Sequence, residues 1–438
     1  MALLAAVSLS TASAATPTAP TGSASASGVL PPSQDPFYDY DGSTPLSAIA
    51  PGTVLKTRTV QAHLEGLPLP VTTIQLLYRT TDSLGNPIVT VTSVLKPLVS
   101  SGTPKLLSYQ SFYDSLSANC EPSYALAGGF DPGLISALEN PLMIALLQTG
   151  YTISTADFEG QQADFADGRQ YGMATLDGIR AALRSPDTGL NTGTKVGMMG
   201  YSGGAIATEW ATELAPSYAP DVNSQLVGSS IGGVFVDPIH NLHYIDGSVV
   251  WTGVLPMALV GIARGYQVDL TPYLSAYAQS LIGQIQNDCL VDDLGHYPGL
   301  TFAKLTKPQY AQPESIPALV NISNQLIMGT GGTPTTPMLI LQGAGGILEG
   351  TPNGGPGIGA GDGVMVAGDV RALANEYCSR GVNVNYQEFP LLSHTLTAVP
   401  WLAETLPWLQ QRFAGAPASS TCGQIPPGNS IAPIQPTS

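Results

Sequence analysis

The stretch Gly200-Tyr-Ser-Gly-Gly204 could hold a reactive serine on a sharp turn. The apolar residues 196–199 before it predict a short buried strand, and the alanine-rich sequence after it predicts a helix. In such a Gly-x-Ser-x-Gly turn the serine hydroxyl is raised clear of the sheet edge, and the glycines avoid Cβ collisions between strand and helix. With 49 glycines in the chain, an ordinary Gly-rich turn is the alternative. The flanking strand and helix favour Ser202 as a nucleophile.

A serine nucleophile needs a histidine to take its proton, and the histidine needs an acid to orient it. His394 follows the last predicted strand, residues 382–389, and we expect it in the loop before a closing helix at residues 400–413. The chain has five histidines, and the other four precede the serine or fall in a helical segment between the serine and His394: His63, His240, His243 and His296. His394 is therefore the predicted base.

Three carboxylic side chains follow a predicted strand at residues 337–342, where the acid belongs. Asp362 stands between two glycines directly before a predicted helix, so a sharp loop can present it. Glu349 comes earlier, in a flexible Gly/Pro-rich context, and is the reserve candidate. Asp369 lies inside the predicted helix, near its N-terminus, where a negative side chain interacts favourably with the helix dipole. Asp362 is the predicted acid.

The order of predicted elements indicates the fold class. Hairpin-like β runs at residues 53–95 give way to alternating strands and helices, which is typical of an α/β fold and, with the serine turn, of an α/β-hydrolase sheet. A mainly helical segment breaks this alternation, and we interpret it as an inserted cap or lid. The predicted organisation is a signal-like segment (1–14), a disordered linker (15–35), a first hydrolase part (36–236), the inserted cap (237–327), a second hydrolase part (328–415) and a disulfide-tethered tail (416–438).

Composition narrows the class of partner. The 31 acidic against 15 basic residues give a formal net charge of −16, so we expect no nucleic-acid partner. Beyond the N-terminal segment, no run approaches the roughly 18 apolar residues that span a bilayer. The apolar start and the small residues of Ala12-Ser-Ala14 are typical of a secretory signal, although a basic start is missing. We predict a secreted protein without a transmembrane anchor.

The four cysteines of an exported chain predict two disulfides, for which three pairings exist. None of the four stands in a Cys-x-x-Cys pair, so we expect no metal site. Serine chemistry of the kind above needs no organic cofactor.

Several spaced stretches resemble the secretory lipase family, in the same order along residues 36–422. They are Gly200-Tyr-Ser-Gly-Gly204, Ser217-Tyr-Ala-Pro220, Asp157-Phe-Glu-Gly160, Cys120-Glu-Pro-Ser-Tyr124 and the region from Cys378 to His394. The resemblance implies an α/β-hydrolase with an inserted helical lid and a triad of Ser202, Asp362 and His394. It also implies an oxyanion hole from the backbone N–H groups of Gly203 and Asp114, and the disulfides Cys120–Cys289 and Cys378–Cys422.

We therefore predict a secreted serine carboxylic ester hydrolase, a lipase, that works through an acyl-enzyme on Ser202. The expected substrate is a lipid or another acyl ester, met at a transient lipid interface by a monomer. A serine peptidase or an acyltransferase on the same fold is one alternative, and a non-catalytic cell-envelope binding protein is the other.

Overall fold

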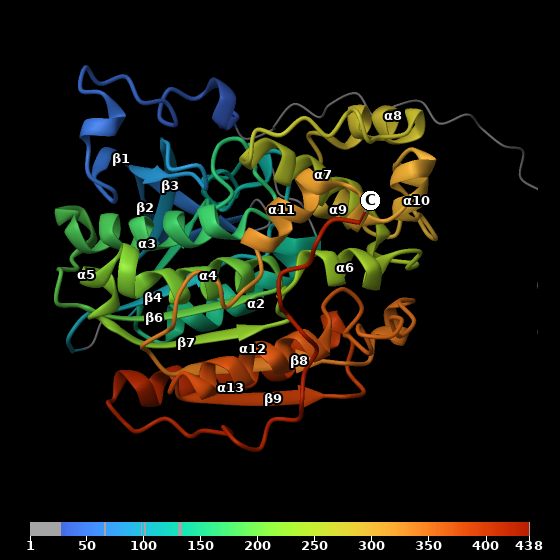
Figure 1. Cartoon of the computed structure of the whole chain (residues 1–438). Helices are drawn as coiled ribbons and strands as arrows, with labels where there is room; N and C mark the ends of the chain where they lie inside the picture. The colour runs from blue at the N-terminus through green and yellow to red at the C-terminus, as the bar shows by residue number, and fades with distance from the viewer. Residues whose placement is uncertain (1–27, 65–66, 98, 100–101, 130–133, 438) are drawn as a thin grey trace, which may run out of the picture.

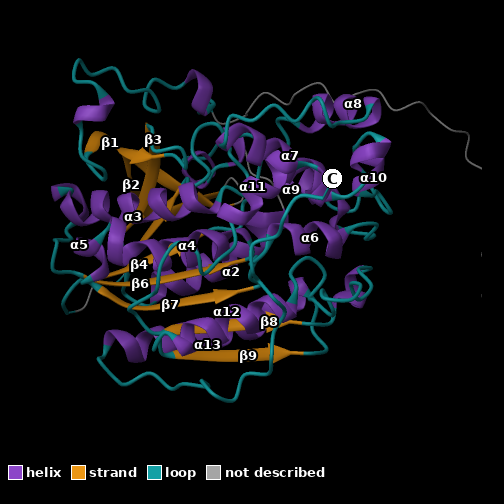
Figure 2. Cartoon of the chain, viewed as in Figure 1, coloured by secondary structure: helices purple, strands orange, loops and turns teal. Residues whose placement is uncertain are grey.

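A mixed nine-stranded sheet runs through the centre of the molecule (Figures 1 and 2). The computed structural model describes residues 28–64, 67–97, 99, 102–129 and 134–437, so the signal-like segment and most of the predicted linker lie outside the described residues. The strand order is β1-β2-β3-β5-β4-β6-β7-β8-β9. Pairing is antiparallel from β1 to β3 and between β3 and β5, and parallel from β5 to β9. The strands are β1 (Val54–Leu64), β2 (Leu67–Thr81), β3 (Pro87–Leu95), β4 (Lys105–Gln110), β5 (Thr152–Ala156), β6 (Lys195–Tyr201), β7 (Leu226–Gly232), β8 (Met338–Gly343) and β9 (Val384–Phe389).

Helices cover both faces of the sheet because its central strands are apolar on both sides. Successive strand residues point to opposite faces. Thus Met198 of β6 packs in the core beneath α3, α4 and α12, whereas Met199 packs in the core beneath α2 and α13. The helices of the sheet layers are α1 (Pro122–Leu126), α2 (Leu134–Gln148), α3 (Gly168–Arg184), α4 (Gly203–Tyr218), α5 (Pro220–Asn223), α12 (Ala367–Ser379) and α13 (His394–Phe413).

Between β7 and β8 the chain leaves the sheet and forms a group of helices with a hydrophobic core of their own. Figure 1 shows them at the end to which the arrowheads of β7, β8 and β9 point. We call this group the cap helices, and its function as a lid stays a prediction. They are α6 (Pro238–Ile245), α7 (Val254–Gly265), α8 (Ala276–Ile285), α9 (Leu290–Asp293), α10 (Phe302–Leu305) and α11 (Pro317–Gln325).

The closing helix begins earlier than the sequence predicts. We expected it from Pro400 and placed His394 in the preceding loop, but α13 starts at His394 itself. The side chain of Ser393 caps it by accepting a hydrogen bond from the N–H of Leu396. Pro400 and Pro407 lie within the helix, so proline did not mark its start, although proline is most common in the first turn.

Two disulfides tie distant segments together, in the pairing that the resemblance implies. Cys120 is joined to Cys289, at the start of α9, and Cys378 of α12 is joined to Cys422 of the tail. Beyond Cys422 the tail runs across to α11, where the backbone of Ile434 exchanges two hydrogen bonds with the side chain of Asn324 (Figure 1). In the part of the chain that the structure describes, no helix has both the length and the apolar character to cross a membrane.

Candidate active site

Ser202 lies on the sharp turn between β6 and α4, in a backbone conformation that a residue with a side chain rarely adopts (φ 54°, ψ −121°). The two glycines of the motif are needed for close approach. A Cβ on Gly200 would lie 2.0 Å from the carbonyl oxygen of Gly204, and one on Gly204 would lie 2.1 Å from that of Gln110. Any other residue at either position would push α4 away from the sheet, so the turn predicted from the sequence depends on both glycines.

A chain of hydrogen bonds runs from Ser202 through His394 to Asp362. The Ser202 Oγ atom lies 2.8 Å from Nε2 of His394, and Nδ1 of the same ring lies 2.8 Å from Oδ2 of Asp362. The backbone N–H of His394 also donates to the carbonyl oxygen of Asp362, at 2.7 Å. Three side chains that are far apart in the sequence therefore meet in the geometry that activates a serine.

Asp362 is held in place by donors other than the histidine. Its Oδ1 accepts from the backbone N–H groups of Val364 (3.1 Å) and Met365 (2.8 Å), and its Oδ2 accepts from Nε2 of Gln342 (3.0 Å). The residue is fully buried. With Nδ1 of His394 included, four donors hold the carboxylate of Asp362. Its orientation is therefore set before any substrate binds.

The other two carboxylic candidates are engaged elsewhere. Glu349 accepts from Nε1 of Trp251 (2.8 Å) and from the backbone N–H of Thr395 (2.9 Å). Asp369 accepts from Nδ1 of His240, at 2.9 Å. Neither carboxylate bonds the ring of His394, although Glu349 lies close enough to influence its charge.

The imidazole of His394 is enclosed by aromatic rings. The ring of Tyr201 lies 5.2 Å from it and that of Trp251 lies 5.1 Å away, edge-on. Burial disfavours the charged ring, but the carboxylates of Asp362 and Glu349 outweigh it, so the pKa of His394 is raised above its ordinary value. A raised pKa makes the imidazole a stronger base for the serine proton.

The two predicted oxyanion donors lie side by side. Gly203 is the first residue of α4, so its N–H is not used by the helix and lies at the positive end of the helix dipole. A Cβ on Gly203 would lie 1.7 Å from Oδ1 of Asp114, which shows how closely the two residues approach. Asp114 has a positive φ of 26°. Burial raises the pKa of the Asp114 carboxyl to about 7.

The loop that carries Asp114 is braced from two directions. Glu159 accepts from the backbone N–H of Ser115 (3.1 Å) and from its hydroxyl (3.0 Å), so the stretch Asp157-Phe-Glu-Gly160 supports the site. On the cap side, Leu290 donates its N–H to the carbonyl oxygen of Asp114 (3.0 Å), and Leu116 donates to that of Asp288 (2.9 Å). The loop therefore bridges the sheet and α9.

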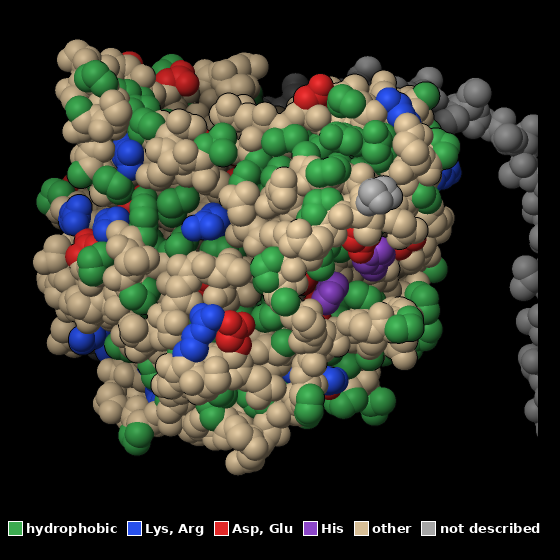
Figure 3. Space-filling model, in the orientation of Figure 1, with side chains coloured by type: hydrophobic (Ala, Val, Ile, Leu, Met, Phe, Trp, Pro, Cys, Tyr) green, Lys and Arg blue, Asp and Glu red, His purple; other side chains and the backbone are tan. Residues whose placement is uncertain are grey.

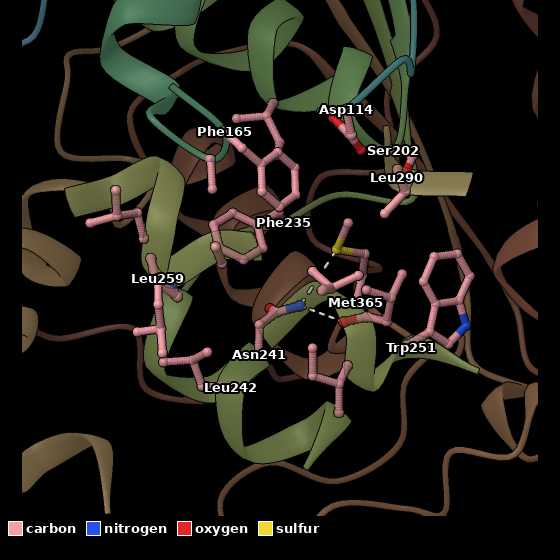
Figure 4. Close-up of a pocket in the computed structure, with 18 of the residues that line it drawn as sticks. Asp114, Phe165, Ser202, Phe235, Asn241, Leu242, Trp251, Leu259, Leu290 and Met365 are labelled. Carbon is pink, nitrogen blue, oxygen red and sulfur yellow. Dashed lines mark hydrogen bonds between the residues drawn. The ribbon is translucent and has the colours of Figure 1, made fainter. Parts of the chain in front are cut away.

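An apolar pocket opens beside Ser202 (Figure 4). Its wall is formed by α6, α7 and the segments before α3 and after β7, with side chains that include Phe165, Phe235, Leu242, Ala258, Leu259 and Ile262. Such a pocket suits a hydrocarbon chain better than a charged group. On the face shown in Figure 3, hydrophobic side chains gather over α7 and α8, and charged ones are scattered.

Comparison with known proteins identifies the family. The family model described as "Secretory lipase" matches residues 132–352. Lipase 4 of Candida albicans is 33% identical over 411 residues, which cover 91% of this chain and 85% of that protein. The chain belongs to the secretory lipase family. A structure of Candida antarctica lipase A superposes with a TM-score of 0.78 at 28% identity and covers 92% of this chain and 90% of that one.

The names of other relatives show that similarity to lipases does not by itself establish activity. A Mycobacterium tuberculosis protein, 34% identical over 89% of this chain and 84% of its own length, is named a probable inactive lipase. The cell-wall-degrading esterase LipA of Xanthomonas oryzae covers 83% of this chain and 100% of its own with a TM-score of 0.61, but at 17% identity it shows the fold alone. Whether a secretory lipase homologue is active therefore depends on its own site.

Two contributors to the site were not predicted from the sequence. Gln342 donates to Asp362, and the ring of Trp251 packs against that of His394. Glu159, which bonds the Asp114 loop, lies in the Asp157-Phe-Glu-Gly160 stretch that already stood out in the sequence. Gln342 had a usable signal, since a polar residue near the end of a buried parallel strand points to the edge where sites form. Trp251 had no such signal in the sequence, because its contact with the ring of His394 depends on how the cap helices pack.

Proposed function

We propose that the protein is a secreted serine ester hydrolase of the lipase type, and that Ser202, His394 and Asp362 are its catalytic triad. The hydrogen-bond chain from the serine hydroxyl to the buried carboxylate is the observation that carries this proposal. Membership in the secretory lipase family supports ester hydrolysis. The description of that family and the two disulfides support secretion.

The reaction follows from the positions of the groups. Nε2 of His394 takes the proton of Ser202 as Oγ bonds to the ester carbonyl carbon, and Asp362 stabilises the imidazolium. The N–H groups of Gly203 and Asp114 donate to the tetrahedral oxyanion. His394 then gives its proton to the departing alcohol, and water repeats the sequence on the acyl-enzyme, releasing the acid.

The substrate is proposed to be a lipid or another ester with an apolar acyl group. The relatives named lipases point to this class, and the pocket beside Ser202 supports it because its wall is almost wholly hydrocarbon. A carboxylate-bearing chain would lose its hydration there without a counter-charge.

Labelling with a fluorophosphonate tests the proposal directly. The purified protein should form an adduct that maps to Ser202 and should hydrolyse p-nitrophenyl esters. Ser202→Ala should lose both properties and stay folded, whereas Ser224→Ala, a change at an exposed serine, should keep both. A folded wild type without label or hydrolysis would refute the proposal and favour the non-catalytic binding protein.

A further inference from the structure

One amide interrupts the apolar wall of the pocket. Asn241 of α6 lines the pocket and is only 3% exposed. Figure 4 shows it among the lining side chains, across the pocket from Ser202 and Asp114. It is therefore a polar group set apart from the proposed chemistry.

The orientation of this amide follows from its neighbours. Its Nδ2 donates to the carbonyl oxygen of Val364 and lies 3.5 Å from the sulfur of Met365 (Figure 4). A flipped amide would bring two oxygen atoms together, so the nitrogen has to face Val364. The Oδ1 atom consequently points away from both neighbours.

This oxygen has no donor among the residues that the structure describes, although it is buried. Buried acceptors in proteins are almost always paired, so a missing donor points to something that the folded chain itself does not supply. A water molecule needs two to four polar partners to be held. The neighbouring lining residues on α6, Leu242 and Ile245, offer none.

We propose that Asn241 determines acyl specificity by accepting a hydrogen bond from a hydroxyl group on the acyl chain. The inference rests on the proposed function and narrows its substrates to include esters of hydroxylated fatty acids. A hydroxyl suits the site because it is a small neutral donor, whereas an ammonium group would be buried without a counter-charge. Away from the Ser202 end, where Asp114 also lines the pocket, a hydroxyl at any other place along the acyl chain would meet hydrocarbon and lose its hydration.

The proposal predicts dependence on the position of the hydroxyl. We would measure kcat/KM for p-nitrophenyl esters of one acyl length, with the hydroxyl moved along the chain one carbon at a time. One position should be preferred over the others by about tenfold, the effect of one satisfied hydrogen bond against a desolvated hydroxyl. In Asn241→Leu this maximum should vanish, while the unsubstituted ester measures any general loss. Leu242→Val, a change in the same pocket wall that leaves the amide intact, should alter rates without removing the maximum.

Binding of the free acids supplies a readout that does not need turnover. Displacement of a fluorescent fatty acid by the same positional series should show the same preferred isomer in the wild type and none in Asn241→Leu. If no ester is hydrolysed but this preference persists, the proposed function fails and the acyl-recognition site stands. A flat positional profile in the wild type overturns the proposal even if the variant does not fold. A maximum that survives Asn241→Leu also overturns the proposal. A bound water molecule would then be the remaining partner for Oδ1 of Asn241.

Discussion

Replacing Asp362 by Asn should nearly abolish turnover through the tautomer of His394. The new side chain has one acceptor and one donor where the carboxylate had two acceptors. Its oxygen can keep the bonds from the N–H groups of Val364 and Met365, which leaves the NH₂ group facing the imidazole. The Nδ1 atom of His394 must then accept, so Nε2 carries the proton and cannot take one from Ser202, 2.8 Å away.

The expected loss in kcat is about 10⁴-fold, or about 5.5 kcal/mol of transition-state stabilisation. Glu349→Gln is the matched control. It removes a nearby negative charge but not the partner of Nδ1, and we expect a loss below about tenfold, the size of one weakened hydrogen bond. Because Glu349 raises the pKa of His394, this variant should also move the acid limb of the kcat/KM profile to lower pH.

The assay is p-nitrophenyl ester hydrolysis against pH, on variants whose circular dichroism and melting temperature match the wild type. An active Asp362→Asn beside an inactive Glu349→Gln would refute the reasoning, since the acid would then act from the Gly-rich loop.

Three further outcomes are expected. Ala258→Phe narrows the pocket on α7, so hydrolysis of long-chain esters should fall while that of acetate stays similar; equal losses on both would show that the cap is only structural. Removing the Cys120–Cys289 disulfide by Ala substitutions should lower the unfolding free energy in denaturant titrations by about 2–5 kcal/mol because the bond closes a long loop; an unchanged midpoint would contradict this. Burial raises the pKa of Asp157 from 3.8 to about 7, so unfolding releases its proton and stability should fall as pH rises between these values. Asp157→Asn should flatten that dependence, and an identical slope in both proteins would show that the carboxyl is ionised when folded.

Much of the candidate site could be predicted because its residues are set by local sequence and chain order. The tight turn at Ser202 requires glycine at both flanks, and His394 was singled out by its place after the last strand. The start of α13 was misjudged because Ser393 caps the helix and the later prolines lie inside it. The hydrogen bonds of Glu159 and the ring contact of Trp251 could not be predicted, since each depends on packing between segments far apart in sequence. The unpaired oxygen of Asn241 is likewise a property of its surroundings.

The bracing of the Asp114 loop constrains how the molecule can move. Asp114 and Leu116 are hydrogen-bonded to the chain around α9, and the adjoining Cys120 is covalently linked to Cys289. Rigid-body rotation of all the cap helices would drag a proposed oxyanion donor out of position. A lid motion of the cap helices that leaves the Asp114 loop in place would therefore have to pivot at α9 and displace α6 to α8. A reducing medium would loosen that pivot, so turnover would decline before the protein unfolds.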